Sequence, residues 1–547
     1  MIGVRRFSKR FFASPAPALF MALFGAFAAI NSNYLDMGFL QLHQIDEYGF
    51  HLSLLDMYDG LREGDLRKIF GYRFYNYGFG FFLLNLFVTM PFLDGTHNAM
   101  AIYLPRMVTS LSALVGLYYL YRTARLQVSA LTGTLFVFLA ISMPAFWTIG
   151  SWFHPDWLMT ACLLVAFYHF ARNDDDPGRN YWRGVLWFGL AAGLGKLQAF
   201  VFLPFLFFYV FHDELARLDF SHFASNLKRA VLSVAAAFAI FVALNPYLLH
   251  PAGLHAFLRI LEQNMVSNAT GHFTRTIHGV GEKIEHAVFD YYLSPLLFLI
   301  LLGLIAFWCT DYFRGGKRRS YQALAFYCAV YFAYLLFGVN KDWPHYYLGL
   351  LIPAVLLAPP LFAGPPRAWR IGILSAAMLL QVGYYGNGYA EIARLSYRSS
   401  TAERVRQHQA ISNFIVESLR DKVETGSIVL ISPFTGFDFE HLGLRYRNVF
   451  LTDGGFLSHE MIDLEALKLK YASDPELAKV KVSRFRQKDF IILNKAEAYF
   501  RPELRQEAYD IVAYDISVEI ISQFDRGHLG YRKIAENKDV VIYQRIL

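Results

Sequence analysis

The sequence has few charged residues and few cysteines for its length. Among 547 residues only 17% are Asp, Glu, Lys or Arg, against roughly 25% in ordinary soluble domains. The three cysteines, Cys162, Cys309 and Cys328, all lie inside apolar runs and show no CxxC or Cys/His ligand spacing. The chain also lacks a P-loop, a GxGxxG motif and internal repeats. These absences argue against a disulfide framework, a thiolate metal site and a nucleotide-binding fold.

What the chain has instead is hydrophobic sequence, at 55% of its residues. Eleven apolar runs approach the length of about 20 residues that crosses a bilayer. They lie at residues 13–35, 103–121, 129–149, 157–171, 184–196, 198–212, 230–249, 291–313, 320–339, 346–363 and 371–388. The formal charge of +7 comes from short basic clusters between these runs rather than from one soluble face, so nucleic acid is not an expected partner.

A further uncharged run, Tyr75–Phe92, is long enough to cross but contains Gly78, Gly80 and Asn85. If it does not cross and the N-terminus is cytoplasmic, the basic clusters all fall on the cytoplasmic side, as the positive-inside rule requires. We therefore expect this run to be interfacial or re-entrant. The outer side then carries residues 36–102, 150–156, 250–290, 340–345 and everything after 389.

The last part of the chain, residues 390–547, is richer in charge and has shorter apolar runs. The stretch TAERVRQHQAISNFIVESL reads as a helix, and GSIVLIS, NVFLT, DFIILN and DVVIYQRI read as strands. Helical or turn-rich stretches such as LEALKLKYASDPELAKV separate them. The predicted architecture is a mainly α, polytopic domain over residues 1–389 with about eleven membrane helices and juxtamembrane helices on the outer side, followed by a small periplasmic α/β domain.

The first candidate functional group is the acidic pair Asp46 and Glu47, at the outer side of the membrane in an apolar and aromatic setting. A carboxylate in such a place can serve as a general base, or it can be a solvated loop residue. Amphipathic residues 51–65 follow, with Leu54 and Leu61 on the face opposite Asp56 and Asp59. We expect this segment to lie along the membrane surface.

Two later outer turns carry further candidates. The sequence His154-Pro155-Asp156 starts a membrane helix, where Asp156 can act as an N-terminal charge. His154 and Asp156 alone are too few ligands to establish a metal site. In VNKDWPHYYLGLLIP, Lys341, His345 and Tyr346 can hold a lipid phosphate or simply anchor the helix at the interface.

The loop within residues 250–290 is rich in histidine. It can bind an anion or a metal, or it can be an ordinary polar loop. The residues singled out in it are His250, His255, His272, Arg275, His278, Glu282 and His286.

The order of these features resembles the GT-C superfamily of membrane glycosyltransferases. An acidic pair in the first outer loop is followed by LPRMVTSLSALVGLYYLYRTAR and by an Asp at the turn between the third and fourth helices. NPYLLHPAGLHAF with GHF, and WPHYYLGLLIPAVLLAPPL, extend the resemblance to the branch of the protein O-mannosyltransferases and the aminoarabinose transferase of lipid A. The resemblance covers roughly residues 10–390.

The resemblance implies an inverting transfer of a sugar from a polyprenyl-phosphate donor. The cytoplasmic basic clusters and compact N-terminus suit a bacterial inner membrane with the site in the periplasm, and an endoplasmic reticulum location is the less natural alternative without retention signals. Asp46 is then the expected general base, with Glu47 orienting substrate or binding a cation. Asp156 holds the sugar or a basic partner, and His154 and His272 contact substrate. The donor phosphate is expected at Lys341, with His345, Arg275 and Tyr346 as further candidates. A divalent metal ion can assist phosphate departure, and the interfacial run at residues 75–92 offers a bed for the lipid tail.

The sequence departs from the family pattern in two places, and other functions stay open. The helix turn reads HPD where many relatives carry a basic residue before Pro-Asp, and no acceptor signature follows the acidic pair. The acceptor can therefore be a glycan, a lipid or a protein. A lipid-linked sugar flippase or other transporter is the main alternative, although no repeated halves are visible. An O-antigen polymerase or ligase is a second.

Overall fold

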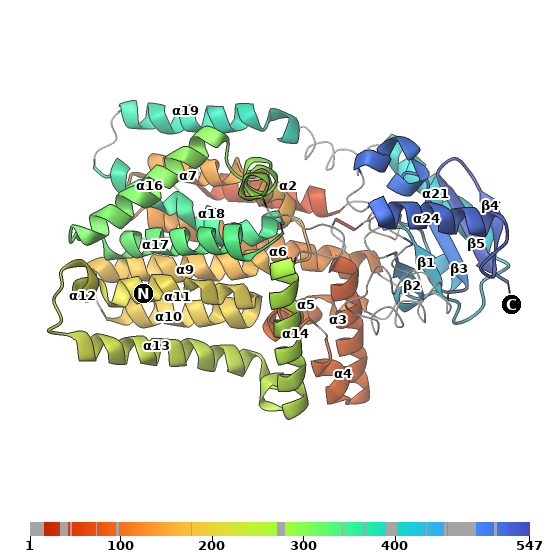
Figure 1. The fold of residues 1–547 in the computed structure, drawn as a ribbon, viewed down its shortest axis with the longest axis horizontal. Coiled ribbons are helices and arrows are strands. Elements are labelled where there is room, and N and C mark those ends of the chain that lie inside the picture. The colour runs from red at the N-terminus through yellow and green to blue at the C-terminus, as the bar shows by residue number, and fades with distance from the viewer. Residues whose placement is uncertain are drawn as a thin grey trace.

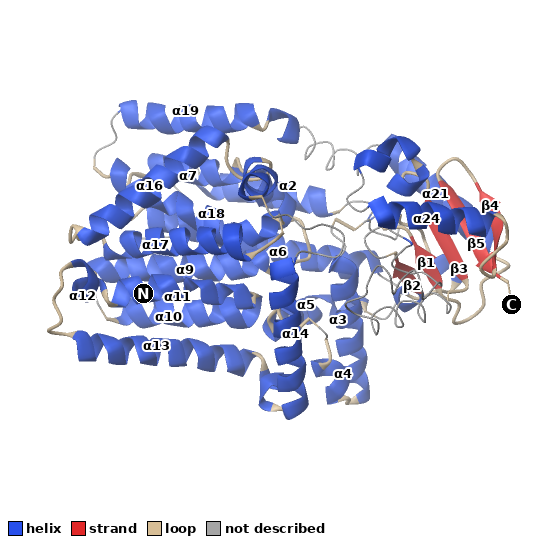
Figure 2. Cartoon of the chain, in the orientation of Figure 1, coloured by secondary structure: helices blue, strands red, loops and turns tan. Residues whose placement is uncertain are grey.

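The protein is predominantly helical, with a small sheet near its C-terminus (Figures 1 and 2). The computed structural model describes residues 16–32, 35, 42–43, 46–72, 74–93, 98–176, 178–270, 279–341, 343–364, 368–389, 402–433, 435–452, 457, 488–507 and 511–546. Long helices form a bundle, and the C-terminal sheet lies beyond one end of it. We call this end the domain end of the bundle.

Each of the eleven apolar runs overlaps at least one helix of the bundle. The helices are α2 (Ala16–Asn31), α6 (Asn98–Ala124), α7 (Ala130–Ile141), α8 (Pro144–Gly150), α9 (Asp156–Asp175), α10 (Arg179–Leu190), α11 (Leu203–Val210), α12 (His212–Ala216), α13 (Phe223–Leu244), α16 (Pro295–Phe313), α17 (Arg319–Ala333), α18 (Leu348–Ala354) and α19 (Ala368–Tyr384). The runs are helical because they combine apolar residues with few internal helix breakers, and the breaks fall at Gly and Pro.

Several of these helices are fit to cross a membrane. Within the described residues, five helices have the length and apolar composition of a full span, and α7 with α8 adds a sixth that is bent by 68°. Three shorter apolar helices cover residues 17–31, 79–92 and 197–210. The chain is therefore an integral membrane protein with multiple apolar helices, although the expected number of eleven spans is not confirmed.

The ambiguous run at residues 75–92 forms the short helix α5 (Phe79–Thr89), followed by one 3₁₀ turn, η2 (Met90–Phe92). Fourteen helical residues reach about 21 Å, less than the roughly 30 Å of a hydrocarbon core. Before α5 the backbone pairs with the break after α10: Gly78 N–H donates to Gly195 O at 2.8 Å. Only glycine fits at position 78, because a Cβ would collide with the Gly193 carbonyl. The run is thus held as a short inserted helix.

Three helices at the domain end cross the direction of the bundle in Figure 1: α3 (Asp46–Glu63), α4 (Leu66–Phe70) and α14 (Pro251–Thr270). Asp65 caps α4, accepting a hydrogen bond from Arg67 N–H at 2.8 Å. Their crosswise placement agrees with the expected juxtamembrane helices. A second apolar core joins α3 and α5 to the C-terminal domain, so α3 lies between the bundle and that domain.

The C-terminal domain has a five-stranded sheet in the order β2-β1-β3-β5-β4. Its elements are α21 (Ala402–Leu419), β1 (Val429–Ile431), β2 (Val449–Leu451), β3 (Phe490–Asn494), α24 (Ile511–Asp525), β4 (Tyr531–Glu536) and β5 (Val540–Arg545). Strands β2, β1 and β3 are parallel, and β5 runs antiparallel to both β3 and β4. The predicted helix and all four predicted strands are confirmed. The stretch LEALKLKYASDPELAKV lies outside the described residues.

Candidate functional site

Four ionisable side chains form a row at the domain end of the bundle. Asp46 is the first residue of α3, and its Oδ2 lies 3.8 Å from His154 Nε2. The other ring nitrogen of His154 pairs with Asp156 Oδ2, and Asp156 Oδ1 lies 3.1 Å from Lys196 Nζ. Residues from three distant parts of the chain therefore meet here. We call Asp46, His154, Asp156 and Lys196 the ionisable row.

The row is buried at one end and open at the other. The side chains of His154 and Asp156 are fully buried, whereas that of Asp46 is 38% exposed. Burial alone would lower the pKa of His154, but the neighbouring carboxylates, Asp156 above all, raise it above its ordinary value. The imidazole of His154 thus lies between the carboxylates of Asp46 and Asp156.

The loop between α8 and α9 holds His154 in place. The carbonyl of His154 accepts a hydrogen bond from Thr109 Oγ1 of α6 at 3.1 Å, and Pro155 is the N-cap residue of α9. The ring of His154 lies between aromatic neighbours, with centroids 5.5 Å from Phe50 and 5.3 Å from Tyr77. Asp156, predicted from the helix turn, is the first residue of α9 and meets Lys196 as a basic partner.

Lys196 was not predicted from the sequence. It follows the π-helical turn Ala191–Gly195 at the end of α10, and it forms a β-bridge with Tyr77. Its ammonium lies 4.8 Å from the centre of the Tyr346 ring and 5.3 Å from that of Tyr77. Its position in the sequence could have indicated it. Lys196 is a lone lysine at the turn between the apolar runs 184–196 and 198–212, and the expected topology places that turn on the outer side.

Glu47 points away from the row into a buried ion pair. Its carboxylate receives two hydrogen bonds from Arg106, from Nε at 2.9 Å and Nη2 at 2.7 Å. It also accepts the backbone N–H groups of Phe153 at 2.9 Å and His43 at 2.8 Å. Burial would raise the pKa of Glu47, but the Arg106 guanidinium holds that pKa below its usual value. The cation that Glu47 binds in this structure is thus an arginine, and the ion pair links α3 to α6.

The segment before α18 brings Lys341, His345 and Tyr346 to the same region. The His345 ring lies 5.1 Å from that of His154, and Tyr346 contacts Lys196 as described. Lys341 Nζ donates to Asn268 Oδ1 at 3.1 Å and lies 4.6 Å from the centre of the Trp343 ring. Burial, helped by the charge of Lys196, lowers the pKa of Lys341 to about 8. The predicted phosphate-binding residues Lys341, His345 and Tyr346 are therefore near the ionisable row.

Two predicted residues, His272 and Arg275, lie outside the described residues, as does His278. In the described part of the same loop, His250 and His255 are exposed near the start of α14, and His286 Nδ1 lies 3.4 Å from Asp290 Oδ2. Neither His250 nor His255 forms part of the ionisable row.

One group of side chains in the described residues has the composition of a metal site. Ligand atoms of His154, Asp156 and His345 all lie within 4.8 Å of one another, and the three residues are buried. Two imidazoles and a carboxylate suit Zn²⁺. One oxygen of Asp156 is, however, already paired with the Lys196 ammonium, which supplies positive charge at the same place.

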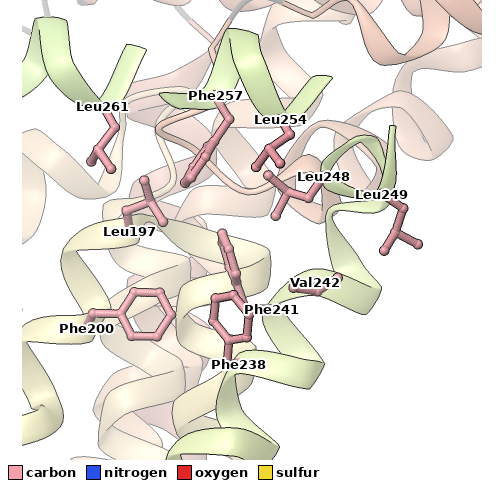
Figure 3. Close-up of a pocket in the computed structure, with 10 residues that line it drawn as sticks. All are labelled: Leu197, Phe200, Phe238, Phe241, Val242, Leu248, Leu249, Leu254, Phe257 and Leu261. Carbon is pink, nitrogen blue, oxygen red and sulfur yellow. The ribbon is translucent and has the colours of Figure 1, made fainter. Parts of the chain in front are cut away.

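An apolar pocket of about 610 Å³ begins one residue along the chain from Lys196, because Leu197 is among its lining residues (Figure 3). Leu197, the residue after Lys196, lines one side of it, and Leu254, Phe257 and Leu261 of α14 lie across from it. Its remaining lining residues are Phe200, Phe238, Phe241, Val242, Leu248 and Leu249. Phe238 of α13 is 55% exposed, so the pocket opens at the apolar surface of a membrane helix.

The run predicted as a bed for a lipid tail is less suited to that role. Most rings of α5, including Phe79, Phe81 and Phe82, are buried in the protein core. The pocket between α13 and α14 offers open apolar volume that α5 does not.

The chain is similar to one known protein family and to several solved structures. The family described as dolichyl-phosphate-mannose-protein mannosyltransferase matches residues 80–250. No curated protein sequence matches the chain. The crystal structure of ArnT from Cupriavidus metallidurans bound to undecaprenyl phosphate is similar over 96% of this chain and 97% of that one, with a TM-score of 0.54 and 12% identity.

A second similar structure is the oligosaccharyltransferase AglB from Archaeoglobus fulgidus, in complex with an inhibitory peptide and a dolichol-phosphate. The similarity covers 92% of this chain and 72% of that one, with a TM-score of 0.51 and 11% identity. ArnT and AglB are both GT-C glycosyltransferases. The shared fold and the family match together confirm the resemblance of this chain to the GT-C superfamily of membrane glycosyltransferases.

Proposed function

We propose that the protein transfers a sugar from a polyprenyl-phosphate donor to an acceptor hydroxyl at the periplasmic face of a bacterial inner membrane. One observation carries the proposal: a half-exposed carboxylate, Asp46, and a buried cation, Lys196, stand at opposite ends of one ionisable row, and the residue after Lys196 lines an apolar pocket. Together they offer a base, a phosphate partner and a place for a lipid tail. The similar structures bind undecaprenyl phosphate or a dolichol-phosphate, which supports a lipid-phosphate donor here.

In the proposed reaction Asp46 removes the proton of the acceptor hydroxyl while its oxygen attacks the anomeric carbon. The bond between that carbon and the donor phosphate oxygen breaks, and its electron pair leaves with the phosphate, so the configuration inverts. General base catalysis of this kind contributes about 10² to 10⁴ in rate. His154, held by Asp156, orients Asp46.

The leaving phosphate needs positive charge rather than a proton. Lys196 and Lys341 are the described cations at this place, and both are buried, where the field of a charge is less screened than in water. If a divalent ion binds, His154, Asp156 and His345 are the residues that would hold it, and it would add positive charge against the phosphate. The residues of the chain already supply that charge.

The pocket between α13 and α14 is the proposed site of the first isoprene units. Its lining is aliphatic and aromatic throughout, and it runs from Leu197, next to Lys196, to the exposed Phe238. A prenyl tail in this pocket and one in the bilayer are both in apolar surroundings, so the pocket would orient the first isoprene units by direct packing rather than by a hydrophobic gain. The tail would enter sideways from the bilayer.

The test is a transfer assay with purified protein in lipid nanodiscs and a panel of radiolabelled polyprenyl-phosphate sugars. Sugar transfer, or slow hydrolysis without acceptor, is the expected result. A photoactivatable prenyl phosphate should crosslink to residues 197–200 and 254–261. Absence of turnover with every donor, together with flipping of the lipid in vesicles, would contradict the proposal and favour a transporter.

A further inference from the structure

The C-terminal domain contacts the helix that carries the proposed base. Tyr48, His51, Asp56 and Asp59 lie on one side of α3, because their spacing follows the helical repeat. All four meet the same short segment of the C-terminal domain. That segment is the 3₁₀ turn η12 (Tyr446–Asn448) together with the start of β2.

The contacts are specific in both shape and charge. The Tyr446 ring lies 4.3 Å from that of His51 and 5.5 Å from that of Tyr48. Tyr48 also donates a hydrogen bond from its hydroxyl to the Val449 carbonyl at 2.8 Å. Arg447 Nη2 then pairs with Asp56 at 3.2 Å and with Asp59 at 2.8 Å.

The segment that makes these contacts is itself held firmly. Asn448 accepts a hydrogen bond from Arg445 N–H at 2.9 Å and donates its own N–H to Arg445 O at 2.8 Å. Val449 is the first residue of β2, which pairs with β1 in the sheet. Tyr446 and Arg447 are therefore fixed relative to the whole C-terminal domain.

The other side of α3 is fixed to the bundle. Glu47 pairs with Arg106 of α6, and the Phe50 ring packs 5.5 Å from both Phe153 and His154. Helix α3 is thus packed between the bundle and the C-terminal domain, with Asp46 in its first turn. Side chains extend about 5–6 Å from a helix axis, so turning α3 by about 10° would move the Asp46 carboxylate by about 1 Å.

We propose that Tyr446 and Arg447 are positioning residues, and that the C-terminal domain acts through α3 to hold Asp46 in its reactive place. This inference rests on the proposed function, in which Asp46 is the base. A displacement of 1 Å in a catalytic group can cost about a hundredfold in rate. Lys196 and Lys341 belong to the bundle and do not depend on this contact, so donor binding should be unaffected.

The experiment compares Tyr446→Ala, Tyr446→Phe and Arg447→Ala with wild type in nanodiscs, with kcat and donor KM measured separately. Arg505→Ala is the matched control. Arg505, like Arg447, pairs with an aspartate, but its partner Asp515, at 2.7 Å, belongs to the C-terminal domain and not to α3. Tyr446→Ala should lower kcat about a hundredfold with donor KM within about twofold. Tyr446→Phe keeps the ring and should restore most of kcat.

Hydrogen exchange at residues 46–52 gives a second readout that needs no turnover. Exchange should be faster in Tyr446→Ala and unchanged in Arg505→Ala. Wild-type kcat in Tyr446→Ala, or equal exchange in the two variants, would overturn the positioning role while leaving the proposed function intact. Wild-type protein that transfers no sugar would overturn the proposed function alone, because the exchange comparison still decides whether Tyr446 holds α3.

Discussion

Removal of the Glu47 carboxylate tests whether this acid is structural, in contrast to its neighbour Asp46. Glu47→Ala deletes the partner of the Arg106 guanidinium, which is fully buried, as is the Glu47 side chain. It also leaves the backbone N–H groups of Phe153 and His43 without the acceptor they have now. Three groups would together lose four hydrogen bonds to the same carboxylate, two of them from Arg106.

The expected loss is large because one charge stays behind in a buried place. Breaking a buried ion pair by removing one partner costs about 3–5 kcal/mol. Each unsatisfied backbone N–H adds about 1–3 kcal/mol, although such losses are not additive. The total of about 5 kcal/mol is a large fraction of the stability of a typical domain. Removing both charges with Glu47→Gln and Arg106→Met should cost less than Glu47→Ala.

The measurement is the thermal midpoint of the purified variants in nanodiscs, followed by intrinsic fluorescence. Glu63→Ala is the control on the same helix, because Glu63 forms an exposed pair with Lys68 and its loss should leave the midpoint unchanged. A midpoint for Glu47→Ala equal to that of wild type would refute the structural role. It would return Glu47 to the list of residues that act on substrate.

Further predictions concern pH, charge and metal. Glu47 has a lowered pKa in the folded state, so its contribution to stability is complete above the unfolded pKa of about 4.3 and is lost as the pH falls further. Between pH 6 and about 3, the thermal midpoint of wild type should therefore show a decrease that Glu47→Ala lacks. Lys341 should lose its proton above its pKa of about 8, so donor KM should rise about tenfold per pH unit above that pH. The variant Lys341→Arg should abolish this rise, and a rise that persists in the variant would contradict the assignment of Lys341 to the phosphate site. Lys196→Ala should slow transfer and weaken donor binding in the same assay, and unchanged kinetics would remove it from the phosphate site. Transfer should persist in a metal chelator because the Lys196 ammonium already occupies one oxygen of Asp156, the single carboxylate of the candidate metal group. Loss of activity that added Zn²⁺ restores would show that the ion is required.

Hydropathy was enough to predict that the bundle is helical, though not its number of full spans, and apolar alternation predicted most of the C-terminal sheet. The eleven runs became helices because long apolar segments have no other way to satisfy their backbone in lipid. Strand β4, with the sequence YRKIAE, was missed because its side chains are mostly exposed and it has no apolar alternation. Helix α24 was missed as well, since IVAYDISVEIISQFD is rich in residues that also favour strands.

The site was predicted in part. Asp46, Asp156 and His345 were candidates because each is an ionisable residue near a helix end in an apolar chain, and the structure brings them close to His154. Their mutual distances depend on packing between α3, α9 and the segment before α18, which no local pattern encodes. Lys196 was overlooked because it stands alone between apolar runs. The division of roles between Asp46 and Glu47 follows from Arg106, which is 59 residues away from Glu47 in sequence.

The most direct test of the central claim compares wild type with Asp46→Asn in the sugar transfer assay, with donor binding measured in parallel. Asn keeps the shape of the side chain, but its amide cannot take up the proton of the acceptor hydroxyl as a carboxylate does. The account predicts a loss of about 10² to 10⁴ in kcat, with donor affinity and thermal midpoint close to wild type. Wild-type turnover in Asp46→Asn would contradict the assignment of Asp46 as the base.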